Sequence, residues 1–389
     1  MPDRFTIVVL IFIFLVGCNS TKSTQLQESA SEFESEISSE NLFLDVAISL
    51  FNPGIDATGD SIFPEIRKAE AKYIPQMLKN TFQSQGRWGV VRLVPTNDDL
   101  LDLHITGNIL FSDGETLRLL IQVQDATGYI WLRKTFVEDA NTSTYQKSWS
   151  AENEPFKSLY EQIENDIYSL LRKASAQKRK FIKTISEIRF AKDFDSQTYS
   201  SYLHEEKNGR RRLVRQPSSD DPQFNRIRQV RLRNSMFVDI LQEEYETFVN
   251  DIGEAYFTWR QKFYHQKIMY RNSLAESQNK IYHGAVQALN ILNPFTLFKL
   301  ISNPSEQTGA GFAVDQIESG LQIRRATDMY KVELQELGKS LDSFAKSHNV
   351  SIDNYVMSLE GTVGQRYNQF RQILREIYLN ESGIILHPK

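Results

Sequence analysis

Residues that could carry out chemistry are scattered along this chain without forming a catalytic set. The histidines are His104, His204, His265, His283, His348 and His387. None stands in a metal-ligand spacing such as H-E-x-x-H, and the chain contains no G-x-S-x-G nucleophile motif. Gly309 and Gly311 lack the strand-turn-helix setting of a phosphate loop. These observations favour a protein that is not an enzyme, with no cofactor and no metal.

Acidic pairs resemble, in type alone, the two carboxylates of a glycosidase. The pairs are Asp193/Asp195, Glu205/Glu206 and Asp220/Asp221. They lie in polar stretches with nothing to raise a pKa, so solvated surface is the favoured interpretation. His104 is predicted on the polar side of a strand and solvated, whereas His265 and His283 are expected to pack on a long helix.

Cys18 is the only cysteine of the 389 residues. It follows an unbroken apolar run, Ile7 to Val16, which Arg4 precedes and which is too short to span a bilayer. Leu15-Val16-Gly17-Cys18 resembles the lipobox of bacterial lipoproteins. The resemblance implies a diacylglycerol on the Cys18 thiol, cleavage after Gly17 and acylation of the new amino terminus. An ordinary cleaved signal with a coincidental cysteine is the alternative.

The anchor determines the expected compartment and partners. The lipoprotein resemblance, with Asn19 after the cysteine, implies the outer membrane facing the periplasm, and acylated Cys18 then binds the lipid bilayer. Residues 19–40 are polar and predict a flexible tether. A net charge of −4 does not call for a nucleic-acid partner, and export argues against one, so none is expected. A single, lipidated thiol excludes a disulfide and thiol catalysis.

Residues 41–150 predict a compact α/β domain. Alternating apolar residues indicate strands near 44–50, 88–94, 101–111, 117–123 and 129–137. A helix is expected from Pro64 to about Gly86, with a kink or restart at Pro75. Asp113-Gly114 is a hairpin signal between two of the strands. The first strand should be half-buried, and the last three should form a meander.

The β-α-β-β-β order of residues 42–137 resembles the small α/β domain of curli-secretion lipoproteins and of the amino-terminal part of Tol–Pal translocation proteins. The resemblance rests on this order and on the helix end running from Phe82 through Gly86 to Trp88 and Val91. It implies an assembly or docking module. No functional residue carries over, and the remainder of the chain departs from both families.

Residues 151–348 predict a helical, coiled-coil-like domain. Apolar residues recur every three or four positions between 238 and 259, which is a heptad seam on a helix expected over 223–293. The seam residues are Val238, Leu241, Tyr245, Phe248, Ile252, Ala255 and Trp259. A return helix is expected beyond Phe312, and the two should form an antiparallel hairpin.

A basic stretch precedes the long helix, within 177–215. Its candidate contacts for an anionic surface are Arg210, Arg211, Arg212 and Arg215. Lipid, lipopolysaccharide or peptidoglycan are the anions considered. A solvated helix followed by a flexible loop is the favoured alternative.

The tip of the hairpin carries the second candidate contact. Charged residues are absent from 281 to 298, and the candidates for partner or membrane contact are Leu289, Leu292, Phe295, Leu297 and Phe298. Such an apolar patch marks a contact if it is exposed; folding back onto the first domain is an equal alternative.

Residues 349–389 predict a closing strand-helix unit, whose strand should join the first sheet or pair with another chain.

The expected class is therefore α+β, and the expected function is a membrane-anchored docking or scaffolding factor with a protein partner in the envelope. Two alternatives stay open: a transport-associated lipid or lipopolysaccharide binding module, and an activator of a peptidoglycan enzyme. Self-association of the chain is also kept open.

Overall fold

The computed structural model describes residues 43–55, 64–95, 101–218, 220–278, 348–352 and 355–382. From Leu44 these belong to one compact unit. The strands are β1 (Val46–Ser49), β2 (Val91–Val94), β3 (Leu103–Ser112), β4 (Thr116–Asp125), β5 (Ile130–Asp139), β6 (Leu203–Glu205), β7 (Arg211–Leu213), β8 (His348–Ile352) and β9 (Tyr355–Leu359). The helices are α2 (Pro64–Ser84), α3 (Lys157–Leu171), α4 (Ala176–Phe194), α5 (Ser196–Tyr199), α6 (Pro222–Gln278) and α10 (Val363–Glu381). Short 3-10 turns are η1 (Thr142–Gln146), η2 (Ala151–Asn153) and η3 (Ser200–Tyr202). The mixed α+β class is as predicted.

The first five strands form one sheet in the order β2-β1-β3-β4-β5. β1 pairs in parallel with β2 and with β3, and β3, β4 and β5 form an antiparallel meander. The predicted β-α-β-β-β order and the turn at Asp113-Gly114 are confirmed, and Gly114 has the positive φ of 80° that such a turn requires.

β1 is more buried than predicted. All four of its residues are buried, whereas its sequence alternation indicated a half-buried strand. The reason is its place between two parallel neighbours, because parallel strands are covered on both faces.

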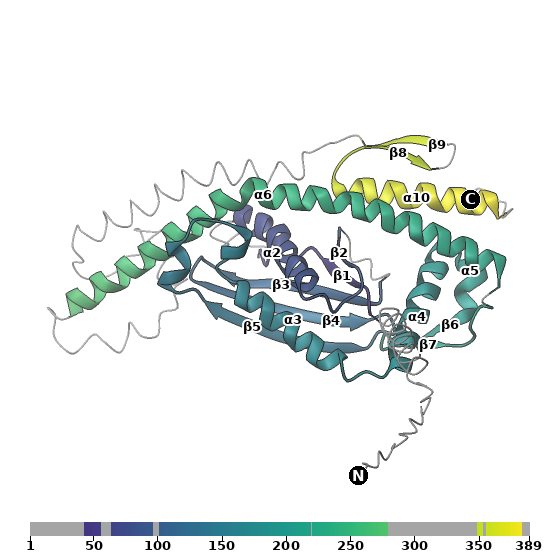
Figure 1. The fold of residues 1–389 in the computed structure, drawn as a ribbon, viewed down its shortest axis with the longest axis horizontal. Helices are drawn as coiled ribbons and strands as arrows, with labels where there is room; N and C mark the ends of the chain where they lie inside the picture. The colour runs from purple at the N-terminus through teal and green to yellow at the C-terminus, as the bar shows by residue number, and fades with distance from the viewer. Residues whose placement is uncertain are drawn as a thin grey trace, which may run out of the picture. The chain divides into compact units, whose positions relative to one another are not determined.

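α2 and α3 cover one face of the sheet, as Figure 1 shows. α2 continues through Pro75 without the expected restart. Its neighbours Ile74, Met77 and Leu78 are buried, and this tertiary packing supports the turn where the proline removes one hydrogen bond. The helix ends at Ser84, and Gly86 follows with a φ of 63°, as predicted.

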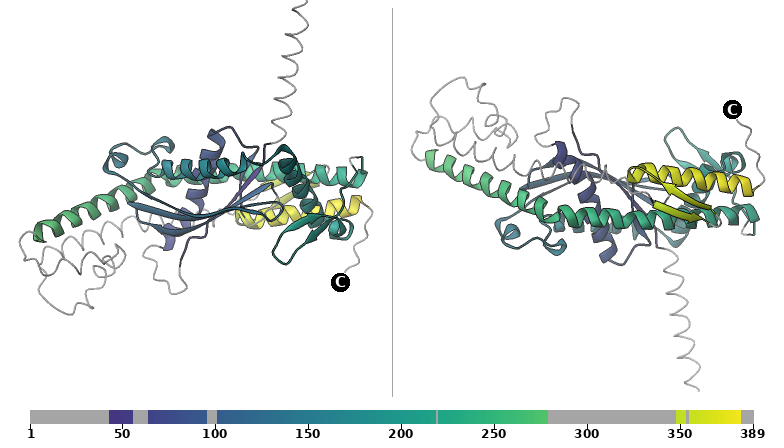
Figure 2. Two further views of the ribbon diagram at one scale, coloured as in Figure 1. Left: turned by 90° about the horizontal axis from the view of Figure 1, so that it is seen from below. Right: turned by 90° about the horizontal axis from the view of Figure 1, so that it is seen from above.

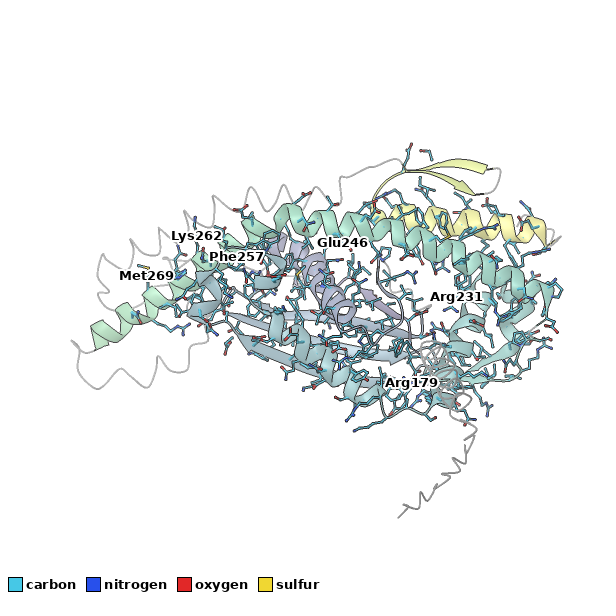
Figure 3. The ribbon with its side chains drawn as sticks, viewed as in Figure 1. Arg179, Arg231, Glu246, Phe257, Lys262 and Met269 are labelled. Carbon is cyan, nitrogen blue, oxygen red and sulfur yellow. The ribbon has the colours of Figure 1, made fainter. Side chains whose placement is uncertain are left out.

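α6 is the long helix that the heptad seam predicts, and it is described from Pro222 to Gln278. The carboxylate of Asp221 accepts hydrogen bonds from the backbone of Gln223 and Phe224 and caps its start. The seam residues are buried, Ala255 partly. In the described structure the helix packs against α2, β2, α4 and α10; Arg231, Glu246, Phe257 and Met269 mark its course in Figure 3. The expected return helix lies outside the described residues.

The carboxy-terminal unit differs from the prediction. Its strand, β9, pairs with β8 in a separate two-stranded sheet rather than with the first sheet. β8 was missed, although Asp353 and Asn354 between the two strands are turn-forming residues. α10 begins with a capping box of Thr362 and Gln365 and packs alongside α6, as both views of Figure 2 show.

Candidate functional site

The strongest concentration of buried charge lies where α6 crosses α2 and the segment before α3. The Arg260 guanidinium of α6 donates from Nη1 and Nη2 to the two carboxylate oxygens of Glu154, over 2.7 and 2.9 Å. Both residues are at least 95% buried. Burial alone would lower the pKa of Arg260, but the nearby Glu154 carboxylate outweighs it and holds that pKa well above its usual value.

Tyrosines complete this cluster, which we call the α6 clamp and define as Glu70, Tyr73, Glu154, Tyr256 and Arg260. Tyr73 donates its hydroxyl to Glu154 over 2.7 Å, and Tyr256 donates to Glu70 over 2.6 Å. Arg260 also lies 4.2 Å from the centre of the Tyr256 ring. Burial first, and the adjacent carboxylates second, raise the pKa of both tyrosines, so both stay protonated donors.

The clamp is suited to holding elements together rather than to proton transfer. Both oxygens of Glu154 already accept hydrogen bonds from Arg260, and one of them also accepts from Tyr73. A general base must reach a substrate proton, and Glu154 is buried. The clamp therefore fixes α6 on the α/β part. Its residues were absent from the sequence-based candidates.

A second buried pair joins β1 to β3. The Ser49 hydroxyl and His104 Nε2 lie 2.6 Å apart, and both residues are buried. The prediction that His104 is solvated is wrong, because this face of the sheet is also covered at the β1–β3 end. A serine-histidine pair has the chemistry of an activated nucleophile. Here it is closed to solvent, and it hydrogen-bonds neighbouring strands.

The basic stretch begins with a helix, α4, as expected, but it ends in an ordered hairpin rather than a flexible loop. β6 and β7 pair through the turn at Gly209, and this turn packs backbone to backbone on the β4–β5 turn at Gly128. The four candidate arginines lie in or just after the hairpin. Arg210 lies 4.4 Å over the ring of Tyr129, and Arg215 lies 4.0 Å over that of Tyr202.

The other two candidates differ from each other. Arg211 is half-buried, donates its backbone N–H to the Thr127 carbonyl over 2.8 Å and forms an ion pair with Glu205. Arg212 is exposed. The structure therefore brings Arg210, Arg212 and Arg215 to the surface, while Arg211 helps to dock the hairpin.

The acidic pairs are only partly solvated. Glu205 and Glu206 are exposed, as predicted. Asp195 is buried instead, caps α5 and accepts from the Tyr378 hydroxyl over 3.3 Å, and Asp193 pairs with two arginines of α10. These partners are distant in sequence, which is why local polarity predicted solvation.

His265 is exposed, so its predicted packing is also wrong.

Several of the candidates predicted from the sequence lie outside the residues that the structure describes. Cys18 and the tip residues, which are Leu289, Leu292, Phe295, Leu297 and Phe298, lie outside the described residues, as does His283. Among the residues that are described, no group of histidine, cysteine and acidic side chains is arranged to hold a metal ion. Within the same residues, no helix is long and apolar enough to cross a membrane.

No protein-family model matches this chain, and no curated protein matches it. A solved chain that matches in structure is the PelC L103M dodecamer from Paraburkholderia phytofirmans, with 13% sequence identity and a TM-score of 0.20. The match covers 33% of this chain and 84% of the other. At that TM-score the likeness carries no argument about fold or function.

Proposed function

We propose that this chain is a lipid-anchored protein of the bacterial cell envelope, at the outer membrane facing the periplasm, that acts as a docking or scaffolding factor without catalysis. The anchor is Cys18 within Leu15-Val16-Gly17-Cys18. The polar residues 19–40 are the tether between this anchor and the folded part.

The observation that carries the scaffolding proposal is the attachment of α6 to the α/β part. Ion pairs tie the helix down along its course: Glu246 to the buried Lys79, Asp239 to Arg92, and Arg260 to Glu154. A helix fixed in this way is a rigid surface. Rigid surfaces lose less conformational entropy when a partner binds, which suits a docking role.

The test is chemical crosslinking in intact cells that express the full chain, followed by its purification and identification of the attached proteins. One envelope protein should be recovered reproducibly. Cys18→Ser serves as the matched variant, because a serine hydroxyl cannot form the thioether and the protein should leave the detergent phase on partitioning. Recovery of the same partner at the same yield from Cys18→Ser would show that the anchor is not needed for docking. Recovery of no partner from the parent protein would contradict the scaffolding role.

Binding of anionic lipid or lipopolysaccharide is the second candidate, and the β6–β7 hairpin favours it. A guanidinium stacked on an aromatic ring can still donate from its edge to phosphate oxygens, and Arg210 and Arg215 lie in this way on Tyr129 and Tyr202. Arg215 also donates from Nη2 to the Ser201 hydroxyl over 3.1 Å. This candidate predicts that the crosslinked material contains lipopolysaccharide rather than a protein, and that Arg210→Glu with Arg215→Glu removes it.

A further inference from the structure

β5 is an edge strand, and no described residue covers its outer side. Among the described residues it pairs with β4 alone. Arg133, Lys134, Thr135, Val137 and Asp139 are exposed along it, Val137 by 47%. Figure 1 shows β5 on the side of the sheet opposite to α6. A long edge of this kind presents unpaired backbone N–H and C=O groups to a further strand.

The ladder with β4 determines which residues face outward. The backbone N–H of Ala140 donates to the carbonyl of Glu115 over 2.7 Å, so these two form a hydrogen-bonded pair. In an antiparallel ladder such pairs alternate with pairs that are not hydrogen-bonded. Residues 138, 136, 134 and 132 therefore bond to β4, and Arg133, Thr135, Val137 and Asp139 point their backbone groups to the open side.

The charges of this strand are divided into two halves. Residues 133–139 read Arg-Lys-Thr-Phe-Val-Glu-Asp, with the basic pair first and the acidic pair last. Antiparallel pairing of this segment with itself around Phe136 places Arg133 opposite Asp139 of a second copy, and Lys134 opposite Glu138. Opposite charges at directly facing positions stabilise an antiparallel pair, and like charges destabilise it.

The backbone and the charges select the same register. Pairing around Phe136 sets residue 135 opposite residue 137 and residue 133 opposite residue 139, so outward-facing groups meet outward-facing groups. A shift to Thr135 as the centre keeps this match but sets Arg133 opposite Val137 and Lys134 opposite Phe136, which loses every charge pair. A shift of one copy by a single residue sets its outward-facing backbone groups opposite residues of the other copy that bond to β4, so the two strands can no longer pair.

We propose that β5 is a self-association surface, at which two copies of this chain join their sheets by two-fold antiparallel pairing centred on Phe136. One carboxylate oxygen of Glu138, Oε2, is buried without a hydrogen-bond partner and lies on the residue that faces Lys134 of the second copy. In the single chain Lys134 pairs with Asp166, and Asp139 accepts from the Thr116 hydroxyl.

The test is sedimentation velocity of the full chain carrying Cys18→Ser, over a range of concentrations up to about 1 mM, where weak association still registers. Two charge variants are compared on this background. The first, Arg133→Asp with Lys134→Glu, makes the strand acidic throughout; the second, Glu138→Lys with Asp139→Arg, makes it basic throughout. Each should associate with itself at least about tenfold more weakly than the parent, because like charges then face each other. An equimolar mixture of the two should form a heterodimer.

The control is Lys147→Glu with Lys173→Asp, which changes the net charge by the same amount as the first variant, at exposed positions outside β5. It should associate like the parent. Thr135→Pro is a further variant, because proline removes an outward N–H without removing a bond to β4; it should weaken association while the thermal unfolding temperature stays near that of the parent. A parent that remains monomeric throughout the range overturns the proposal. So does a dimer that both charge variants leave intact, or a mixture of the two that remains monomeric.

Discussion

The two edges of the main sheet are treated in opposite ways. At the β2 edge, the side-chain amide of Gln242 on α6 accepts from the backbone N–H of Leu93 over 2.8 Å and donates to its carbonyl over 3.0 Å. Beside it, Arg92 of β2 forms a two-bond pair with Asp239, over 2.7 and 2.8 Å. At the β5 edge no described residue of the same chain takes this place.

The difference shows what the long helix does for the sheet. An amide side chain that bonds both backbone groups of one residue imitates a neighbouring strand, so α6 closes the β2 edge to other chains. Of the two edges of the main sheet, only the β5 edge then remains uncovered by described residues. Variants at the clamp that holds α6, at the two edges themselves and at the far end of α6 test this difference.

The largest expected effect comes from releasing the clamp. Arg260→Met leaves the buried carboxylate of Glu154 without its cation, which should cost about 3–5 kcal/mol of unfolding free energy. Denaturant unfolding followed by tryptophan fluorescence measures this. Lys262→Met, an exposed position on the same turn, should change the free energy by no more than about 0.5 kcal/mol. Similar losses of unfolding free energy from both variants would show that Arg260 does not stabilise the buried Glu154 carboxylate.

Proline exchange at each edge compares the edges directly. Leu93→Pro removes the N–H that Gln242 accepts and should cost about 3 kcal/mol or more, whereas Thr135→Pro should cost within about 1 kcal/mol. Leu93→Ala separates the loss of the buried side chain from the loss of the N–H. Unfolding of both proline variants at the same denaturant concentration would contradict the inferred difference between the two edges.

The smallest effect concerns the far end of α6. Burial raises the pKa of Glu115, but hydrogen bonds from Lys267 and Arg271 outweigh it and leave the pKa below its usual value. A carboxylate with a lowered folded-state pKa contributes stability above its unfolded pKa of about 4.5, and this is lost as the pH falls through the folded value. Glu115→Gln should therefore be slightly less stable than the parent at pH 7, and this difference should shrink as the pH falls below about 4.5. A constant difference across that range would exclude the linkage.

Sequence reasoning identified elements better than their partners. The alternation in 101–137 and the Asp113-Gly114 turn predicted β3, β4 and β5, and the heptad spacing predicted the buried face of α6. Periodicity reports that a face is buried and not what buries it. The contacts of α6 with α2 and β2, which cover part of the seam, therefore could not be predicted from the sequence.

Buried polar residues were the main failure. His104 and Asp195 were expected in solvent, because an isolated polar residue is usually exposed. Each finds a partner far along the chain, 55 residues away at Ser49 and 183 residues away at Tyr378. The clamp is hidden for the same reason, since 106 residues separate Glu154 from Arg260. Such pairs leave no local signal in a single sequence.

The bond between Gln242 and Leu93 also has a consequence for biosynthesis. The two residues are 149 positions apart, and the ribosome makes β2 long before it makes the helix that covers it. Until residue 242 has been synthesised, the nascent sheet has both of its edges uncovered by α6. Contacts between distant residues form slowly, and uncovered strands aggregate during that delay. The same helix that covers the β2 edge in the finished protein is thus made too late to cover that edge in the nascent chain.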